Sequence, residues 1–291
     1  MNATTIAMAV RHFHLSDAFS SFTRSGLYVI AAGLKKKAVL RIWVMPDADR
    51  VLSSFPKVRP ELPETYRKIY AEHYRRNREG LSPASSLSQK MEAWMHRRVA
   101  RDAATRKTPS STLEIGAGNL NHVQYEPDGE IYDVVEDLIE LPEKSPRRHR
   151  IRYAYRSVDE IQNHKYDRII SIAVFEHFCD LPTAVAKCGL LLTSTGQMRI
   201  GVPSEGTILW RLGWGLTTGV EFRARHGLNY GVLMRHEHVN TAKEIEGVLR
   251  FFFKKVRREV LGLMPALSFY QYFECSEPDI QRCHGIFERT R

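Results

Sequence analysis

The spacing of apolar positions changes near residue 110. Before that point they recur every three or four residues, which predicts two helices, over 63–80 and 85–103. After it, short apolar runs alternate with polar connections, which predicts a parallel sheet with helices on its faces. Strands are expected at 112–115, 131–135, 152–156, 167–172, 197–202, 256–261 and 267–273, and helices at 181–192 and 241–253.

This pattern divides the chain into three parts. Residues 1–62 are predicted to form an N-terminal arm and residues 63–110 a pair of helices. Residues 111–291 are predicted to form one α/β domain with a doubly wound, mostly parallel sheet and an insertion at 204–240. Periodicity is weak before Met45, so a further hypothesis is that the native chain starts there and that part of the arm is disordered or not native.

Composition narrows the functional classes. The formal net charge is +10, and the excess of Lys and Arg lies in residues 1–110. Such a segment can attract nucleic acid, anionic lipid or an acidic ligand, but a solvated helical face is the simpler interpretation. No apolar run reaches the roughly 18 residues of a membrane span. Four cysteines without a CxxC pair indicate reduced thiols, and we expect a cytoplasmic protein.

The stretch STLEIGAGNLNH, residues 111–122, carries the main chemical signal. Gly116 and Gly118 follow a predicted strand, where a backbone without Cβ atoms can turn sharply and approach a ligand. Glu114 is awkward for a pyrophosphate but suits a cation. The loop therefore favours a positively charged nucleoside such as S-adenosylmethionine over NAD, and Asn121 replaces the third glycine of the dinucleotide motif.

Polar residues also follow the next strands. Glu136 and Asp137 end the second strand about 20 residues after the glycines, where nucleotide-binding folds place a carboxylate for the ribose hydroxyls. Ser157 and Val158 end the third strand, where an adenine edge would lie. Each signal has a structural alternative, such as a solvated acid in a turn.

Together these motifs make residues 112–206 resemble a class I S-adenosylmethionine-dependent methyltransferase. The matching stretches are LEIGAG, VVED, SVDEI, YDRIISIAVFEH and LLLTSTGQMRIGVPSEG. The resemblance implies a seven-stranded sheet with its last strand antiparallel, and the pattern of this chain adds N-terminal helices and an inserted lid after strand five. It also implies a cofactor site with the methionine part near the first loop, the ribose on Glu136 and the adenine near Val158. The residues expected around the cofactor are Glu114, Gly116, Ala117, Gly118, Asn119, Glu136, Asp137, Ser157, Val158 and Ser171.

The chain departs from that family between strands one and two. Only about twelve residues separate Gly118 from Ile131, and Pro127 lies among them, so any helix there has two turns or fewer. The side chains of Asn119, Asn121 and His122 are expected to supply hydrogen bonds in place of the usual helix N-terminus.

Three residues are candidates for the catalytic group. His177 directly follows the fourth strand, and the stretch MRHEHVN places Glu237 and His238 before the last predicted long helix. A histidine is a natural general base near neutral pH. The alternating His236 and His238 could also bind a metal ion, but no third ligand is evident in the sequence, so we expect no metal. A purely structural role for this motif also stays open.

The insertion at 204–240 is the best candidate for an acceptor lid. Trp210 and Trp214 are four residues apart and would share a helix face. The arginines could hold an anionic acceptor bidentately, or could simply be solvated. These are Arg211, Arg223 and Arg225.

The sequence therefore favours methyl transfer from S-adenosylmethionine to a small-molecule or glycan-type acceptor. The alternatives are a nucleic-acid methyltransferase, a non-catalytic S-adenosylmethionine-binding protein and, as the weakest, a dehydrogenase. The Asn-Pro-Pro-aromatic tetrad of enzymes that methylate base or amide nitrogens is absent after strand four, and no RNA-binding module is evident. Nucleic acid is therefore not the expected partner.

Overall fold

A computed structural model describes residues 27–29, 42–44, 51–70, 83–103, 105 and 110–289. It separates into two units, Met1–Arg50 and Val51–Arg291. Within the first unit, β1 (Leu27–Val29) and β2 (Ile42–Val44) form an antiparallel pair. The hypothesis about Met45 falls outside the described residues, as does the second half of the first predicted helix; residues 64–70 of that helix are helical.

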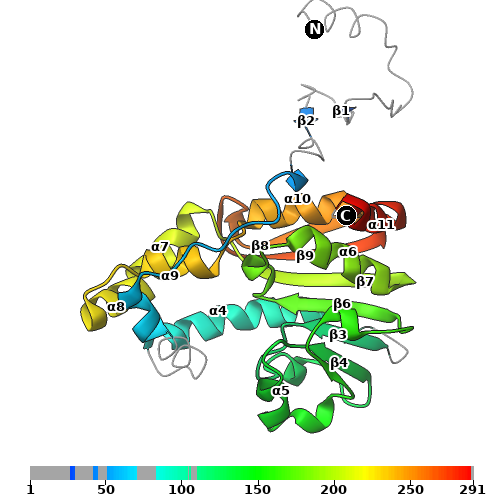
Figure 1. Ribbon diagram of the computed structural model, residues 1–291, viewed down its shortest axis with the longest axis horizontal. Coiled ribbons are helices and arrows are strands. Elements are labelled where there is room, and N and C mark those ends of the chain that lie inside the picture. Colours follow the sequence, from blue (N-terminus) through cyan, green and yellow to red (C-terminus); the bar gives the residue numbers. More distant parts are fainter. Residues whose placement is uncertain are drawn as a thin grey trace, which may run out of the picture. The chain divides into compact units, whose positions relative to one another are not determined.

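The second unit is built on a seven-stranded sheet in the order β5-β4-β3-β6-β7-β9-β8 (Figure 1). β9 runs antiparallel to both of its neighbours, and the other pairings are parallel. The predicted doubly wound α/β sheet with an antiparallel last strand is confirmed. The strands are β3 (Ser111–Ile115), β4 (Ile131–Val135), β5 (Ala154–Tyr155), β6 (Tyr166–Ile172), β7 (Leu192–Pro203), β8 (Phe253–Met264) and β9 (Leu267–Pro278).

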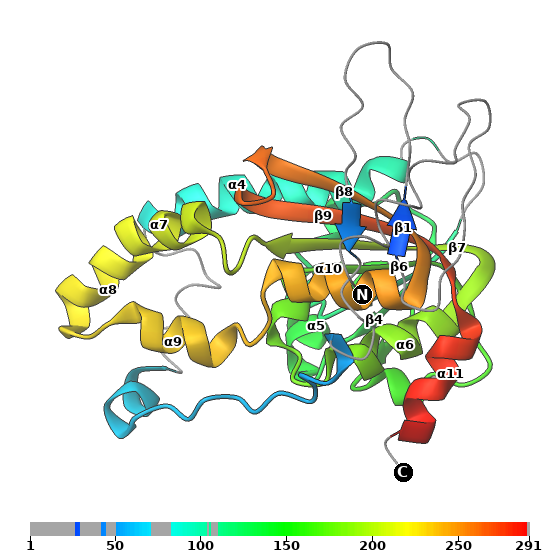
Figure 2. The same cartoon turned by 90° about the horizontal axis from the view of Figure 1, so that it is seen from above.

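Helices cover both faces of this sheet (Figures 1 and 2). α6 (Leu181–Leu191), α10 (Ala242–Phe252) and α11 (Ile280–Arg289) lie on one face, and α4 (Pro83–Val99) lies on the other. Neighbouring residues of β6 point to opposite sides: Ile169 packs in the core with α6 and α10, and Ile170 in the core beside α4. This two-sided burial explains why the central strands are apolar runs rather than alternating patterns.

Local signals position the helices at the carboxyl ends of the strands. Asp180 caps α6 by accepting a hydrogen bond from Thr183 N, and Pro182 occupies its first turn. Thr241 and Glu244 form a reciprocal capping box at the start of α10, as the sequence indicates. α11 was not predicted; its buried Cys283 faces α6, where Gly189 has no Cβ to obstruct it.

The sheet edge beyond β3 carries few helices. Only a single 3-10 turn, Val123–Tyr125, separates β3 from β4. α5 (Glu140–Lys144) and a second 3-10 turn, Arg148–Arg150, separate β4 from β5. The predicted reduction of this part of the domain is confirmed.

The insertion after β7 contains three short helices, α7 (Ile208–Leu216), α8 (Thr218–His226) and α9 (Tyr230–Glu237). They lie beyond the carboxyl end of β7 (Figure 2). Leu62 and Tyr66 from the preceding segment pack against Phe222 and Leu233 in a small separate core. The segment 51–70 therefore holds the insertion in place, although residues 51–62 were predicted to belong to an N-terminal arm and residues 63–70 to the first helix.

A buried network of charges joins α4 to the sheet. Arg168 on β6 donates to Glu126 Oε2 at 2.8 Å and to Asp102 Oδ1 at 3.0 Å. Arg199 on β7 lies 3.1 Å from the same Asp102 carboxylate and also pairs with Glu274 on β9. Both guanidinium groups are almost fully buried, so each depends on its carboxylates for the hydrogen bonds that water cannot supply.

No helix within the described ranges combines the length and the apolar character needed to cross a membrane. The four cysteines are free thiols, and three of them are buried.

Candidate active site

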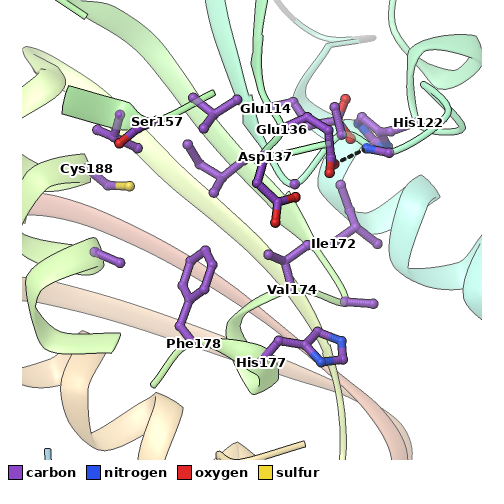
Figure 3. A pocket seen from close by; sticks show the side chains of 18 of the residues that line it. Glu114, His122, Glu136, Asp137, Ser157, Ile172, Val174, His177, Phe178 and Cys188 are labelled. Carbon is purple, nitrogen blue, oxygen red and sulfur yellow. Dashed lines mark hydrogen bonds between the residues drawn. The ribbon is translucent and has the colours of Figure 1, made fainter. Parts of the chain in front are cut away.

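A cavity of about 870 Å³ lies at the carboxyl ends of β3, β4 and β6 (Figure 3). This is where parallel α/β sheets bind ligands. Nine of the ten predicted cofactor residues line it. They are Glu114, Gly116, Ala117, Gly118, Asn119, Glu136, Asp137, Ser157 and Val158.

Ser171 is the exception. Its hydroxyl is buried and donates to the carbonyl of Ile115 at 3.2 Å, so it ties β6 to β3. It is not among the residues that line the cavity, and the cleft-lining role expected for it is wrong. The residues that follow it in the chain, Ile172, Ala173 and Val174, form the wall instead.

The first loop requires glycine at its centre. Gly116 has φ of +73°, and a Cβ there would lie 2.4 Å from Cγ2 of Val174. Its N–H donates to the carbonyl of Val135 at 2.8 Å, which fixes the loop to the end of β4. The bare backbone therefore fits between the turn after β6 and the cavity, as the sequence motif predicts.

Glu114 lies at the floor of this loop, 3% exposed. The hydroxyl of Tyr132 donates to its Oε2 at 2.8 Å. Burial raises the pKa of the Glu114 carboxyl to about 7, because the surrounding apolar atoms solvate a charge poorly. A cation entering the cavity would restore its ionised form.

Glu136 lies at the end of β4. Its Oε2 accepts a hydrogen bond from the N–H of Gly118 at 2.7 Å, and its Oε1 accepts from Leu138 N at 3.3 Å. Burial raises the pKa of Glu136, and its hydrogen bond with the side chain of Asp137 raises it further. Glu114, Glu136 and Asp137 gather in one part of the cavity, apart from His177 (Figure 3).

The third strand end closes the far side of the cavity. Ser157 caps the 3-10 turn Val158–Glu160 by accepting from Asp159 N at 3.2 Å. Val158, Phe178 and Cys188 line this side with largely apolar atoms. Arg156 and Lys187 also line the cavity here, so this side offers an apolar surface for a flat ring together with polar groups at its rim.

The predicted catalytic residues meet beside the cavity, although they come from two distant segments. His177 lies in the 3-10 turn Phe175–His177 after β6, and its Nδ1 lies 2.8 Å from the carbonyl oxygen of Glu237. His177 and Glu237 both line the cavity. His238 lies behind them, with its ring 4.9 Å from that of His177, and is not among the lining residues.

Three further residues surround the predicted catalytic residues or hold them in place. Glu176 is 1% exposed, and burial raises its pKa to about 7. Glu205 accepts from His238 Nδ1 at 2.9 Å. Arg59 donates to the carbonyls of His177, at 2.7 Å, and of His236, at 2.6 Å. Glu176 was visible in the motif FEH, but no local pattern marks Arg59 or Glu205.

The predicted lid differs from expectation in its contacts. Trp210 and Trp214 do lie on α7, and the indole of Trp210 donates to Glu205. None of the three arginines lines the cavity, and Arg225 pairs with Glu221 on its own helix. The arrangement gives no support to an anionic acceptor held by those arginines.

Comparison with known proteins shows a shared fold. No protein-family model matches the chain. No curated protein matches it either. Among solved structures, the plantazolicin methyltransferase BamL, in complex with a triazolic desmethylPZN analogue and S-adenosylhomocysteine (SAH), is 13% identical. The match covers 78% of this chain and 92% of that one, with a TM-score of 0.50.

Two other structures show weaker likeness. The 1,6-didemethyltoxoflavin-N1-methyltransferase of Burkholderia thailandensis is 14% identical over 89% of this chain and 99% of its own, with a TM-score of 0.48. The N-methyltransferase NodS of Bradyrhizobium japonicum is 15% identical over 75% and 100%, also at 0.48. With the strand order and the antiparallel β9, the chain has the fold of class I S-adenosylmethionine-dependent methyltransferases.

Proposed function

We propose that this protein transfers a methyl group from S-adenosylmethionine to a small-molecule acceptor. The observation that carries the proposal is the single cavity in which the Glu114–Gly118 loop and the carboxylates of Glu136 and Asp137 meet. Three carboxylates around one nucleoside-sized space suit a ligand with a ribose and a positive charge. They would repel the pyrophosphate of a dinucleotide.

The residues present fit the cofactor. Gly116 lets the first loop pack against Val174, where a Cβ would collide with that side chain, so the loop can border the ligand space with bare backbone. Glu114 would face the cationic methionine part, and Glu136 has lone pairs left to accept from ribose hydroxyls. Val158 and Phe178 would pack against adenine.

S-adenosylmethionine supplies an electrophilic methyl group on a sulfonium. The protein's part is then mainly to align the acceptor and to exclude water. Arg59 fixes the turn that carries His177 to the end of α9, so the acceptor end of the cavity has a defined wall. The predicted roles of His177, Glu237 and His238 in handling the acceptor stay part of this proposal.

A small molecule is favoured because the cavity is walled by folded segments on its acceptor side. Tyr70 lines that side from the helical residues 64–70, and Glu237 lines it from α9. An acceptor must fit between these segments and the first loop. A glycan-type metabolite is compatible with the polar character of this wall.

Isothermal titration with S-adenosylmethionine and with SAH tests the proposal. We expect one-to-one binding of both at micromolar concentrations and no comparable binding of NAD. Absence of binding to a chain shown to be folded by circular dichroism would reject the proposal. Methyl transfer to a panel of candidate hydroxyl and amine acceptors would then separate an enzyme from a binding protein.

The buried carboxyl of Glu114 predicts a pH dependence of cofactor affinity. Its pKa of about 7 means that it is protonated below pH 7, and binding a cation then requires loss of that proton. The affinity of the wild type relative to Glu114→Gln should fall as pH decreases from 8 to 6. Taking this ratio removes any titration of the ligand itself. An identical pH profile for both proteins would contradict the assignment.

The same carboxyl also affects the stability of the fold. Its ionised form favours binding of a cation but disfavours folding of the ligand-free protein. Burial raises the pKa of Glu114 from 4.5 to about 7. The free-energy penalty that its ionisation imposes on folding therefore grows between pH 4.5 and pH 7 and is complete above pH 7. In the absence of ligand, Glu114→Gln should therefore be more stable than the wild type at pH 8. The difference should shrink toward pH 5.

A further inference from the structure

Three side chains converge beside the acceptor end of the cavity. Glu176 and His177 lie in the turn after β6, and His238 follows α9. One ligand-type atom from each lies within 4.8 Å of the others. The two rings meet edge to face, with centroids 4.9 Å apart.

Hydrogen bonds fix the same tautomer in both histidines. Nδ1 of His177 lies 2.8 Å from the backbone carbonyl of Glu237, and a carbonyl can only accept, so the proton is on Nδ1. Nδ1 of His238 lies 2.9 Å from the carboxylate of Glu205, which places its proton likewise. Each neutral ring then carries its lone pair on Nε2, and histidines that bind metals are oriented in this way.

Glu176 supplies an independent observation that points to a cation as ligand. It is 1% exposed, and among the described residues its Oε2 has no hydrogen-bond partner. Its Oε1 lies 3.8 Å from Nε2 of His177, so the carboxylate faces the histidine pair. A buried carboxylate oxygen without a donor is unusual in a native protein, and a bound ion is a common explanation.

We propose that Glu176, His177 and His238 bind a divalent transition-metal ion such as Zn²⁺ or Mn²⁺. Two imidazole nitrogens and one carboxylate oxygen suit these ions better than Ca²⁺ or Mg²⁺, which prefer oxygen ligands. His236, the other histidine of the HEH motif, lies outside this cluster, because its ring packs edge to face against Tyr70 and its Nδ1 lies 2.7 Å from the carbonyl of Pro60. Of the HEH motif only His238 takes part, and the two other ligands, Glu176 and His177, come from the turn after β6.

Such an ion would leave coordination positions open. His177 lines the cavity, so an acceptor oxygen could occupy one of them. An ion held there would lower the pKa of an adjacent acceptor hydroxyl, so that its proton would be lost to solvent more readily and its oxygen would be a better nucleophile for the methyl group. This role rests on the proposed function, whereas the binding of the metal does not.

Metal titration of the full-length chain tests the site without S-adenosylmethionine. After treatment with a chelator and its removal, we expect one equivalent of Zn²⁺ or Mn²⁺ to bind, with micromolar or better affinity. Co²⁺ should give the visible absorption bands of a site with nitrogen ligands. Glu176→Gln and His238→Ala should each weaken binding at least 100-fold, whereas His236→Ala should leave it unchanged.

Several outcomes would overturn the proposal. They are the absence of stoichiometric binding to the folded wild type, wild-type affinity in folded Glu176→Gln, or loss of binding in His236→Ala. Glu176→Gln keeps the shape of the side chain, so it remains informative even if His238→Ala fails to fold. Titration with SAH in the absence of metal tests the cofactor site alone, so failure of either proposal is recognised independently of the other.

Discussion

Replacing Arg168 by methionine is expected to lower the free energy of unfolding by about 3–5 kcal/mol. The guanidinium is 2% exposed and donates to Glu126 and Asp102. Methionine fills much of the same volume, but it leaves a buried carboxylate without its cationic partner. Urea unfolding followed by circular dichroism would measure the loss.

The matched control is Arg148→Met. Arg148 pairs with Glu143 at 3.1 Å on the surface, where both side chains are more than a third exposed. Solvent screens such a pair, so this variant should lose about 0–1 kcal/mol. Equal losses in the two variants would mean that burial of the Arg168 network contributes little.

Replacing Glu136 by alanine is expected to weaken binding of S-adenosylmethionine and SAH by about 1–3 kcal/mol, which is about 5- to 150-fold in dissociation constant. The variant loses the acceptors proposed for the ribose hydroxyls. It also loses the bond of 2.7 Å from Gly118 N, which holds the first loop against β4. Calorimetric titration at a fixed pH would give both affinities.

Two variants separate these contributions. Glu136→Gln keeps an oxygen that can accept from Gly118, so it should recover part of the lost affinity. Glu143→Ala removes an exposed carboxylate from the nearby connection outside the cavity and should bind like the wild type. Unchanged affinity in a folded Glu136→Ala variant would remove this residue from the ribose site.

The parts of the site that could be predicted from the sequence are those fixed by residues close together in the chain. The acid–x–Gly–x–Gly loop follows a strand, and parallel strands end at one edge of a sheet, so the meeting of Glu114 and Glu136 can be predicted without any knowledge of packing. The helix at α10 is equally local, because Thr241 and Glu244 satisfy each other's backbone within one turn.

The parts that were missed depend on contacts between distant segments. Arg59 and Glu205 gain their roles only once the insertion folds back toward β6, and no spacing in the sequence records this. The Arg168 network also depends on contacts between distant segments, because its carboxylates lie 42 and 66 residues away along the chain. Ser171 was misjudged because a hydroxyl at a strand end can serve either a ligand or the neighbouring strand.

The hydrogen bonds of Arg59 have an evolutionary consequence. They join the segment 51–70 to the end of α9 and to the turn after β6. Neither His236 nor His177 belongs to the segments proposed to hold the cofactor loop and the ribose, residues 114–118 and 136–137. The acceptor side of the cavity and most of its proposed cofactor side are thus built from different stretches of the chain. The two halves of the cavity can therefore diverge at different rates, so a lineage could exchange one methyl acceptor for another while its cofactor half is retained.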